Sequence, residues 1–177
     1  MNAKKMLDLQ TNADLAKLVQ QLENAMQGDG GRARRVCGVL AGEANKQCIL
    51  NGLVYQFDSD HYRRELLYAD PQGRFSLLAL IWQPGQVTPL HGHQAWCAVA
   101  VHTGELVETA YEVSADRTMS QQTGERCLQA GSVTYDETGD NVAHRIANHS
   151  SGMAISLHVY GVPAERVEDG VNVILDG

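Results

Sequence analysis

Apolar residues in the first part of the chain repeat at intervals of three and four positions, which is typical of amphipathic helices. A first repeat ends at the glycine-rich stretch 28–31, a strong helix stop, and a second extends from about Arg32 to Gln47. We therefore predict two helices that form an N-terminal cap over about residues 1–50. The apolar positions of the first repeat are Leu15, Leu18, Val19, Leu22 and Met26.

From about residue 60 onward the pattern changes to short runs of β-branched and aromatic residues separated by turn-forming residues. This spacing predicts a mainly β architecture, a jelly-roll barrel over about residues 60–177. The length fits a single domain, 1–177, and we expect the acidic segment after Pro163 to pack against the outside of the barrel. The strand candidates are Phe75–Trp82, Cys97–Val101, Glu105–Val113, Ser132–Tyr135, Ala143–Ala147 and Ala154–Tyr160.

Composition narrows the range of partners and compartments. A formal net charge of -7 argues against binding of nucleic acid, which needs a clustered basic surface. No apolar stretch has the length of a signal-peptide core or a membrane span, so we expect no membrane partner and a cytoplasmic location. The four cysteines form no CxxC pair and are expected to be reduced thiols. These features leave the oligomeric state open.

The segment 85–104 contains a candidate metal site. His91 and His93 are two positions apart, so in a strand both imidazoles point to the same side and can reach one ion. Taken alone, such a pair is also explained as two polar strand residues. Here Gly85 precedes His91 by six positions and Gly104 follows Cys97 by seven, which resembles the first motif of the cupin superfamily.

A later histidine resembles the second cupin motif. His144 is followed four positions later by Asn148, although the motif's proline is absent. The resemblance implies that His144 completes a three-histidine metal site with His91 and His93.

Many metal cupins add a glutamate ligand near the position of Cys97. Without that carboxylate, three neutral ligands leave the charge of the cation uncompensated, which favours an anionic, chelating substrate such as a thiolate. Imidazoles with open positions suit iron(II), and zinc fits the same ligand type.

Four features narrow the resemblance to the cysteine dioxygenase family over about residues 62–160. A cysteine follows the second histidine of the pair by four positions, and a tryptophan precedes the first histidine by nine. A Tyr-x-Arg segment and a Ser-x-His-x-Tyr segment are also similar to those of the family. The residues concerned are Cys97, Trp82, Tyr62, Arg64, Ser156, His158 and Tyr160.

The resemblance implies an enzyme that holds one Fe(II) ion per chain and uses O2 to oxidise L-cysteine to cysteine sulfinic acid. Arg64 would receive the substrate carboxylate while Tyr160 donates a hydrogen bond nearby. Tyr62 and Trp82 would line the same substrate site. Because neighbouring residues on a strand alternate in direction, we expect Arg63 to face away from the cavity.

The resemblance also implies a group of residues around the tyrosine. Ser156 and His158 would fix the hydroxyl of Tyr160, and Cys97 can form a thioether crosslink with that tyrosine in the family. Cys97 is an even number of positions after His93, so on a continuous strand its sulfur would lie on the same face as the histidines.

Each of these residues also has an ordinary structural explanation. Cys97 could be a small buried hydrophobe, and Tyr160 could be a core residue with a hydrogen-bonded hydroxyl. Arg64 could be a surface cation, and His158 a core histidine. These explanations do not account for the register of all four residues with one set of motifs.

Two alternative functions remain open at this point. The first is the dioxygenase of 3-mercaptopropionate, whose members typically have glutamine at the position of Arg64 and glycine at that of Cys97; Trp96 and the segments 66–70 and 158–161 resemble that branch. The second is a cupin that binds a metal or small ligand without turnover. Consumption of O2 in the presence of a thiol would separate an enzyme from such a binder.

Overall fold

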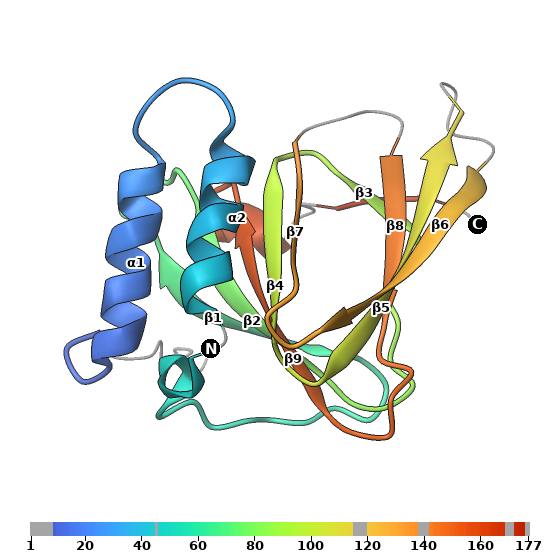
Figure 1. The fold of residues 1–177 in the computed structure, drawn as a ribbon, viewed down its shortest axis with the longest axis horizontal. Coiled ribbons are helices and arrows are strands. Elements are labelled where there is room, and N and C mark those ends of the chain that lie inside the picture. Colours follow the sequence, from blue (N-terminus) through green and yellow to red (C-terminus); the bar gives the residue numbers. More distant parts are fainter. Residues whose placement is uncertain (1–8, 45, 115–119, 138–141, 169–171, 176–177) are drawn as a thin grey trace.

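The computed structural model of the chain describes residues 9–44, 46–114, 120–137, 142–168 and 172–175 (Figure 1). The helices are α1 (Ala13–Ala25), α2 (Arg32–Glu43), the 3-10 helix η1 (Gln47–Leu50) and α3 (Ala164–Glu168). The strands are β1 (Arg63–Ala69), β2 (Ser76–Trp82), β3 (His91–His93), β4 (Cys97–Thr103), β5 (Glu105–Val113), β6 (Ser120–Gln129), β7 (Val133–Asp136), β8 (Val142–Ala147), β9 (Ala154–Tyr160) and β10 (Asn172–Ile174).

The two predicted N-terminal helices are present. The first begins after Asn12, whose side-chain oxygen accepts a hydrogen bond from the backbone N–H of Leu15 at 2.9 Å and whose amide donates to the carbonyl of Ile49 at 2.8 Å. The second helix is shorter than predicted, because it ends at Glu43 and the backbone at Lys46 is extended. A separate 3-10 turn follows instead of a further helical turn.

The described strands form two five-stranded antiparallel sheets that are the walls of a barrel. The order in the first sheet is β1-β2-β9-β4-β7, and the order in the second is β10-β3-β8-β5-β6. The mainly β jelly-roll architecture predicted from the sequence is thereby confirmed.

Helices α1 and α2 cover the outer face of the first sheet (Figure 1). Strands β2 and β9 are therefore buried on both faces, and this explains why β2 is a continuous apolar run. On β2, Leu77 and Ala79 pack with the helices, whereas Leu78 and Trp82 face the barrel interior. The alternating residues of β9 divide in the same way, which directs Tyr160 and its even-numbered neighbours into the barrel.

Strands β6 and β10 were not predicted from the sequence. Almost every side chain of β6 is exposed, with Leu128 as the buried exception, so this strand lacks the apolar alternation that marks a half-buried strand. Strand β10 is only three residues long and is positioned by pairing with β3, where Asn172 lies opposite His93. Both segments are strands because of their pairing: β6 pairs with β5, and β10 pairs with β3, which is distant in the sequence.

The segment after Pro163 does not simply pack on the outside of the barrel. In α3, Val167 is 5% exposed and joins the interior cluster of apolar residues. Residues Asn172–Ile174 then add an edge strand to the second sheet. The expectation of a segment packed on the outside is therefore wrong for β10, which forms part of the barrel wall.

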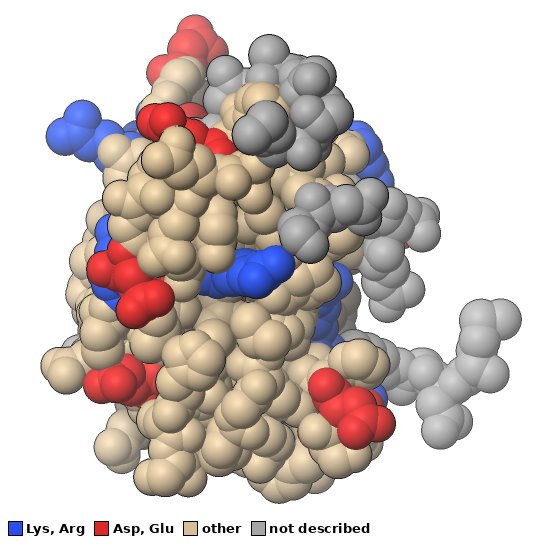
Figure 2. All heavy atoms as spheres, turned by 90° about the vertical axis from the view of Figure 1, so that its right-hand side faces the viewer, with Lys and Arg blue, Asp and Glu red and all other residues tan. Residues whose placement is uncertain are grey.

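The surface on the right of Figure 1, near β6, carries separated acidic and basic side chains, and the residues described there form no broad patch of one sign (Figure 2). Within the described part of the chain, no helix combines the length and apolar character needed to cross a membrane.

Candidate metal centre

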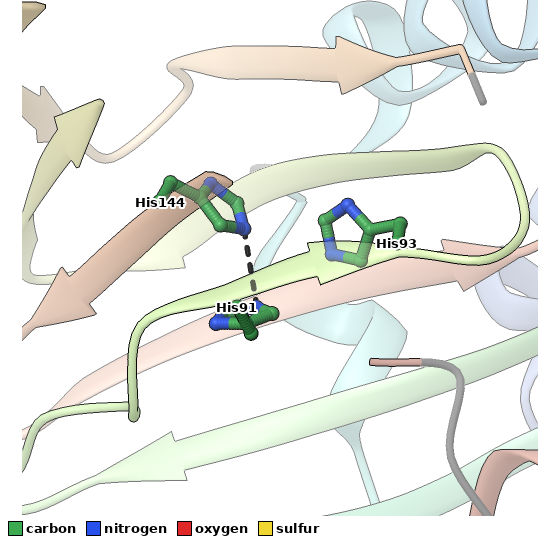
Figure 3. A group of neighbouring side chains, drawn as sticks. All are labelled: His91, His93 and His144. Carbon is green, nitrogen blue, oxygen red and sulfur yellow. Dashed lines mark hydrogen bonds between the residues drawn. The ribbon is translucent and has the colours of Figure 1, made fainter. Parts of the chain in front are cut away.

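Three histidines converge in the barrel interior. His91 and His93 come from β3, and His144 comes from the adjacent β8, directly opposite His91 (Figure 3). One ring nitrogen from each histidine lies within 4.8 Å of those of the other two. His91 is 4% exposed and His93 is 8% exposed, so the group is largely shielded from water. The structure thus brings together the three residues that the sequence nominated as metal ligands.

The partners of these rings define which nitrogen carries the proton. Nδ1 of His91 lies 3.0 Å from the carbonyl oxygen of Pro89, which can only accept. Nδ1 of His144 lies 2.7 Å from a carboxylate oxygen of Glu108 and Nδ1 of His93 lies 3.3 Å from one of Asp136. Each neutral ring therefore donates from Nδ1 and keeps a lone pair on Nε2.

This tautomer assignment leaves two lone pairs facing each other. Nε2 of His91 and Nε2 of His144 are 3.2 Å apart, as the dashed line in Figure 3 marks. Two acceptors at this distance repel unless a positive charge lies between them. The arrangement therefore fits a cation that accepts both lone pairs.

Burial keeps the rings of His91 and His93 in the neutral form that binds metals. The pKa of His91 falls to about 3, mainly because of burial and also because of repulsion from a charged His144. Burial likewise lowers the pKa of His93, although Asp136 acts in the opposite direction. At neutral pH these two imidazoles therefore carry no proton on the metal-facing nitrogen, and a divalent cation has no proton to displace there.

Cys97 lies beside the cluster but does not belong to the group of converging donor atoms. Its side chain is 2% exposed, and burial raises the pKa of its thiol. A protonated thiol is a poor metal ligand, because the thiolate is the binding form. The donor set is therefore three neutral imidazoles with no thiolate, which fits a first-row divalent metal with open coordination positions.

Cys97 and His93 do not share a continuous strand, which was the condition for the predicted direction of the Cys97 sulfur. The strand is not continuous from His93, because β3 ends there and belongs to the second sheet, whereas Cys97 begins β4 in the first sheet. Cys97 still reaches the cavity, because the two sheets face each other across the barrel. It lies directly opposite Tyr160 on the neighbouring β9, and opposed side chains on antiparallel strands share a face.

A chain of hydrogen bonds runs along the interior face of β9. The indole N–H of Trp82 donates to Oγ of Ser156 at 2.9 Å, and this oxygen lies 2.8 Å from Nε2 of His158. Nδ1 of His158 lies 3.1 Å from Oη of Tyr160. Indole can only donate, so the serine hydroxyl is free to give its own proton to Nε2, and Nδ1–H then donates to the phenol oxygen.

Both groups at the end of this chain are held in their uncharged form. Burial lowers the pKa of His158 well below its ordinary value. Burial, together with Cys97, raises the pKa of Tyr160 well above its ordinary value. The phenol therefore keeps its proton and, with its oxygen already accepting from His158, can direct O–H toward the cavity.

The predicted substrate residues lie next to the histidines. The ring of Tyr62 stacks on that of Trp82 with centroids 4.4 Å apart, and the Tyr62 hydroxyl accepts a hydrogen bond from Arg64 at 3.0 Å. Arg64 lines a small cavity together with His91 and Tyr160. Arg63 points elsewhere and donates to the side chain of Gln56.

Two cavities meet at the histidines. The larger, of about 400 Å³, extends along Glu108 and Arg126, and the smaller, of about 10 Å³, lies beside Arg64 and Tyr160. The smaller space holds about one water molecule. A substrate carboxylate can reach Arg64 only if side chains around that space move.

Three residues that support the histidine cluster were not predicted from the sequence. Glu108 and Asp136 contact histidine rings, and Arg126 pairs with Glu108. The sequence did contain a signal for Glu108. It is two positions after the apolar Leu106 on a predicted strand, so both side chains belong to the interior face. Asp136 and Arg126 carry no comparable local signal.

Comparison with known proteins shows to which family the chain belongs. A family model described as cysteine dioxygenase type I matches residues 2–169 of this chain. The chain belongs to the cysteine dioxygenase family. The resemblance inferred from the motifs is thereby confirmed. Family membership and the three-histidine cluster together support an iron-dependent thiol dioxygenase.

Relatives within the family include cysteine dioxygenase type 1 of Rattus norvegicus, 29% identical over 168 residues that cover 92% of this chain and 80% of the relative. The Homo sapiens protein of the same name is 28% identical over the same shares of the two chains. A similar solved structure is an RmlC-like cupin family protein with a double-stranded β-helix fold from Methanocaldococcus jannaschii, with 17% identity and a TM-score of 0.46 over 67% of this chain and 97% of that chain.

Proposed function

We propose that this chain is an iron(II)-dependent dioxygenase that oxidises the thiol of L-cysteine to cysteine sulfinic acid. The observation that carries the proposal is the meeting, at one small cavity, of the imidazole cluster with the guanidinium of Arg64 and the phenol of Tyr160. A thiolate suits a metal held by the imidazoles, a carboxylate suits the guanidinium, and the phenol can donate a hydrogen bond to the substrate. The related cysteine dioxygenases support cysteine as the substrate.

His91, His93 and His144 would hold the iron through their Nε2 atoms, because Nδ1 of each ring is already engaged. Iron(II) in such a site supplies a Lewis acid for the thiolate and a redox partner for O2. The overall reaction is balanced without a further reductant. One thiol and one O2 give one sulfinic acid, both oxygen atoms passing to sulfur, which loses four electrons.

Arg64 binds the substrate carboxylate in this proposal. A guanidinium presents parallel N–H donors that match the two oxygens of a carboxylate. The side chain of Tyr62 restricts where this guanidinium can lie, since its hydroxyl accepts from Arg64 and the Arg64 cation lies 5.5 Å from the centre of its ring. Carboxylate binding would therefore fix the distance between the substrate sulfur and the metal.

Tyr160 holds a proton beside the reacting sulfur in this proposal. Its hydroxyl oxygen accepts from His158, so its proton can point into the cavity. In this proposal Ser156 accepts from Trp82 and donates to Nε2 of His158, which gives the tautomer that donates from Nδ1 to Tyr160. The phenol would orient the substrate and stabilise negative charge on the oxygens as they are transferred to sulfur.

The second candidate substrate is 3-mercaptopropionate, a thiol acid without the amine. Two of the features that resemble that branch, Trp96 and Gly161, are in contact. A Cβ atom on Gly161 would lie 2.2 Å from Nε1 of Trp96. The indole can therefore occupy its position only because residue 161 has no side chain. These two residues therefore count as one structural feature, and the substrate residue Arg64 favours the cysteine branch.

Oxygen uptake by the purified iron form tests the proposal with three thiols: cysteine, 3-mercaptopropionate and cysteamine. We expect cysteine to give the highest kcat/KM, with one O2 consumed for each sulfinic acid formed. Cysteamine should be the poorest substrate, because it has no carboxylate for Arg64. A higher kcat/KM for 3-mercaptopropionate would establish the second candidate, and metal binding without O2 uptake with any thiol would establish a non-catalytic cupin.

A further inference from the structure

Glu108 is a buried carboxylate to which the proposed reaction gives no role. It lies on β5 and its residue surface is 6% exposed. Burial of a charge in a barrel interior is costly unless the charge is paired and hydrogen-bonded. Its neighbours on the inner face of the second sheet provide that pairing.

The two carboxylate oxygens of Glu108 have different partners. Oε1 accepts from Nδ1 of His144 at 2.7 Å, and Oε2 accepts from the guanidinium of Arg126, which lies directly opposite on β6. Arg126 also donates to the hydroxyl of Thr134 on β7 in the facing sheet. The carboxylate is therefore fixed on both sides. Both partners are N–H donors, a guanidinium and an imidazole, and a carboxylate that accepts on both oxygens matches them.

The three histidines differ in the support that each receives. Among the described residues, the partner of Nδ1 of His91 is the neutral carbonyl of Pro89 at 3.0 Å. His93 has the carboxylate of Asp136, but at 3.3 Å and with that side chain 34% exposed. The Glu108 side chain is only 8% exposed. A short, shielded, charge-assisted hydrogen bond is the strongest of the three kinds, so His144 is the best-supported ring.

We propose that Glu108 is the positioning residue of the metal centre, which fixes the ring of His144 and increases electron donation from its Nε2 to the bound metal. Arg126 holds the carboxylate in place from the next strand. This inference rests on the proposed function only in requiring that the three histidines bind a metal. It gives a role to a buried carboxylate that does not belong to the group of candidate metal donors.

Glu108→Gln tests the inference, because glutamine keeps a hydrogen-bond acceptor and the side-chain length but removes the charge. Asp136→Asn is the matched control at the other carboxylate that contacts a histidine. The readouts are the dissociation constant of Co(II), measured by competition with a chelator, and the visible absorption spectrum of the Co(II) protein. The melting temperature of each metal-free protein shows whether the fold is intact.

We expect Glu108→Gln to weaken Co(II) binding about 10- to 100-fold and to shift the absorption bands of the bound ion, while the metal-free melting temperature changes little. Asp136→Asn should weaken binding by about fivefold or less, because its contact with His93 is longer, at 3.3 Å, and its side chain is 34% exposed. If the glutamine variant does not fold, Glu108→Asp keeps the charge but withdraws it from His144, and the same loss is expected.

Equal effects of Glu108→Gln and Asp136→Asn, or an unchanged absorption spectrum, would overturn the inference. Metal binding by the wild-type chain without thiol-dependent O2 uptake would refute the proposed function alone. Failure of the wild-type chain to bind Co(II) or Fe(II) would refute both.

Discussion

Replacement of Arg64 by glutamine should reduce turnover of carboxylate-bearing thiols selectively. Arg64 borders the small cavity together with the histidine cluster and Tyr160, so its charge acts on the substrate and not on distant surface groups. Loss of one charged hydrogen-bonding partner costs about 1.5 to 3 kcal/mol. This corresponds to a decrease of roughly 10- to 150-fold in kcat/KM for cysteine.

The neighbouring Arg63 provides the control. Its side chain is 37% exposed and lies 4.0 Å from the carboxylate of Asp58. It donates a hydrogen bond to the side chain of Gln56 and does not line the cavity beside Arg64. Arg63→Gln should therefore leave kcat/KM for cysteine within about fivefold of the wild-type value, the range for an exposed ion pair.

Steady-state O2 uptake with cysteine and cysteamine separates a carboxylate clamp from a general defect. Arg64→Gln should lower kcat/KM for cysteine but change that for cysteamine little, because cysteamine has no carboxylate. Equal losses from Arg63→Gln and Arg64→Gln, or an equal loss with both thiols, would refute the reasoning.

Three further predictions concern other parts of the molecule. Aerobic turnover should link Cys97 to Tyr160 in part of the protein and lower its intact mass by about two hydrogens relative to the unlinked residues; this crosslink should be absent from Cys97→Ser, which should still bind iron. Gly161→Ala should destabilise the fold by about 1 to 3 kcal/mol in chemical denaturation, because the new Cβ overlaps the indole of Trp96, and an unchanged midpoint would contradict this. Hydrogen bonds from the partly exposed Arg74 lower the pKa of the buried Asp70, so the contribution of Asp70 to stability is complete above about pH 4 and is lost as pH falls through the folded-state pKa. The difference in melting temperature between wild type and Asp70→Asn should therefore shrink on acidification, whereas a constant difference would exclude this linkage.

Local spacing in the sequence was sufficient for those parts of the molecule in which chemistry lies within one strand. The period of two places His91 and His93 on one side, and it places Ser156, His158 and Tyr160 along one face of β9. The motif glycine Gly104 is also a local requirement, because its φ of +77° is a conformation that residues with a side chain rarely adopt. Such features follow from backbone geometry alone.

Contacts between distant segments required the tertiary structure. The change of sheet between His93 and Cys97 could not be predicted from the spacing, so the condition of one continuous strand did not hold. Strand β6 has no apolar alternation, so neither its position nor the place of Arg126 opposite Glu108 was visible in the sequence.

The sequence by itself thus determined the barrel, its helical cap and the nature of the candidate metal donors, because apolar periodicity and residue type are local properties. The tertiary structure alone decided which carboxylate supports which histidine. Glu108 and Asp136 reach His144 and His93 through strand pairing and sheet packing, and many registers of the same strands satisfy the same apolar pattern.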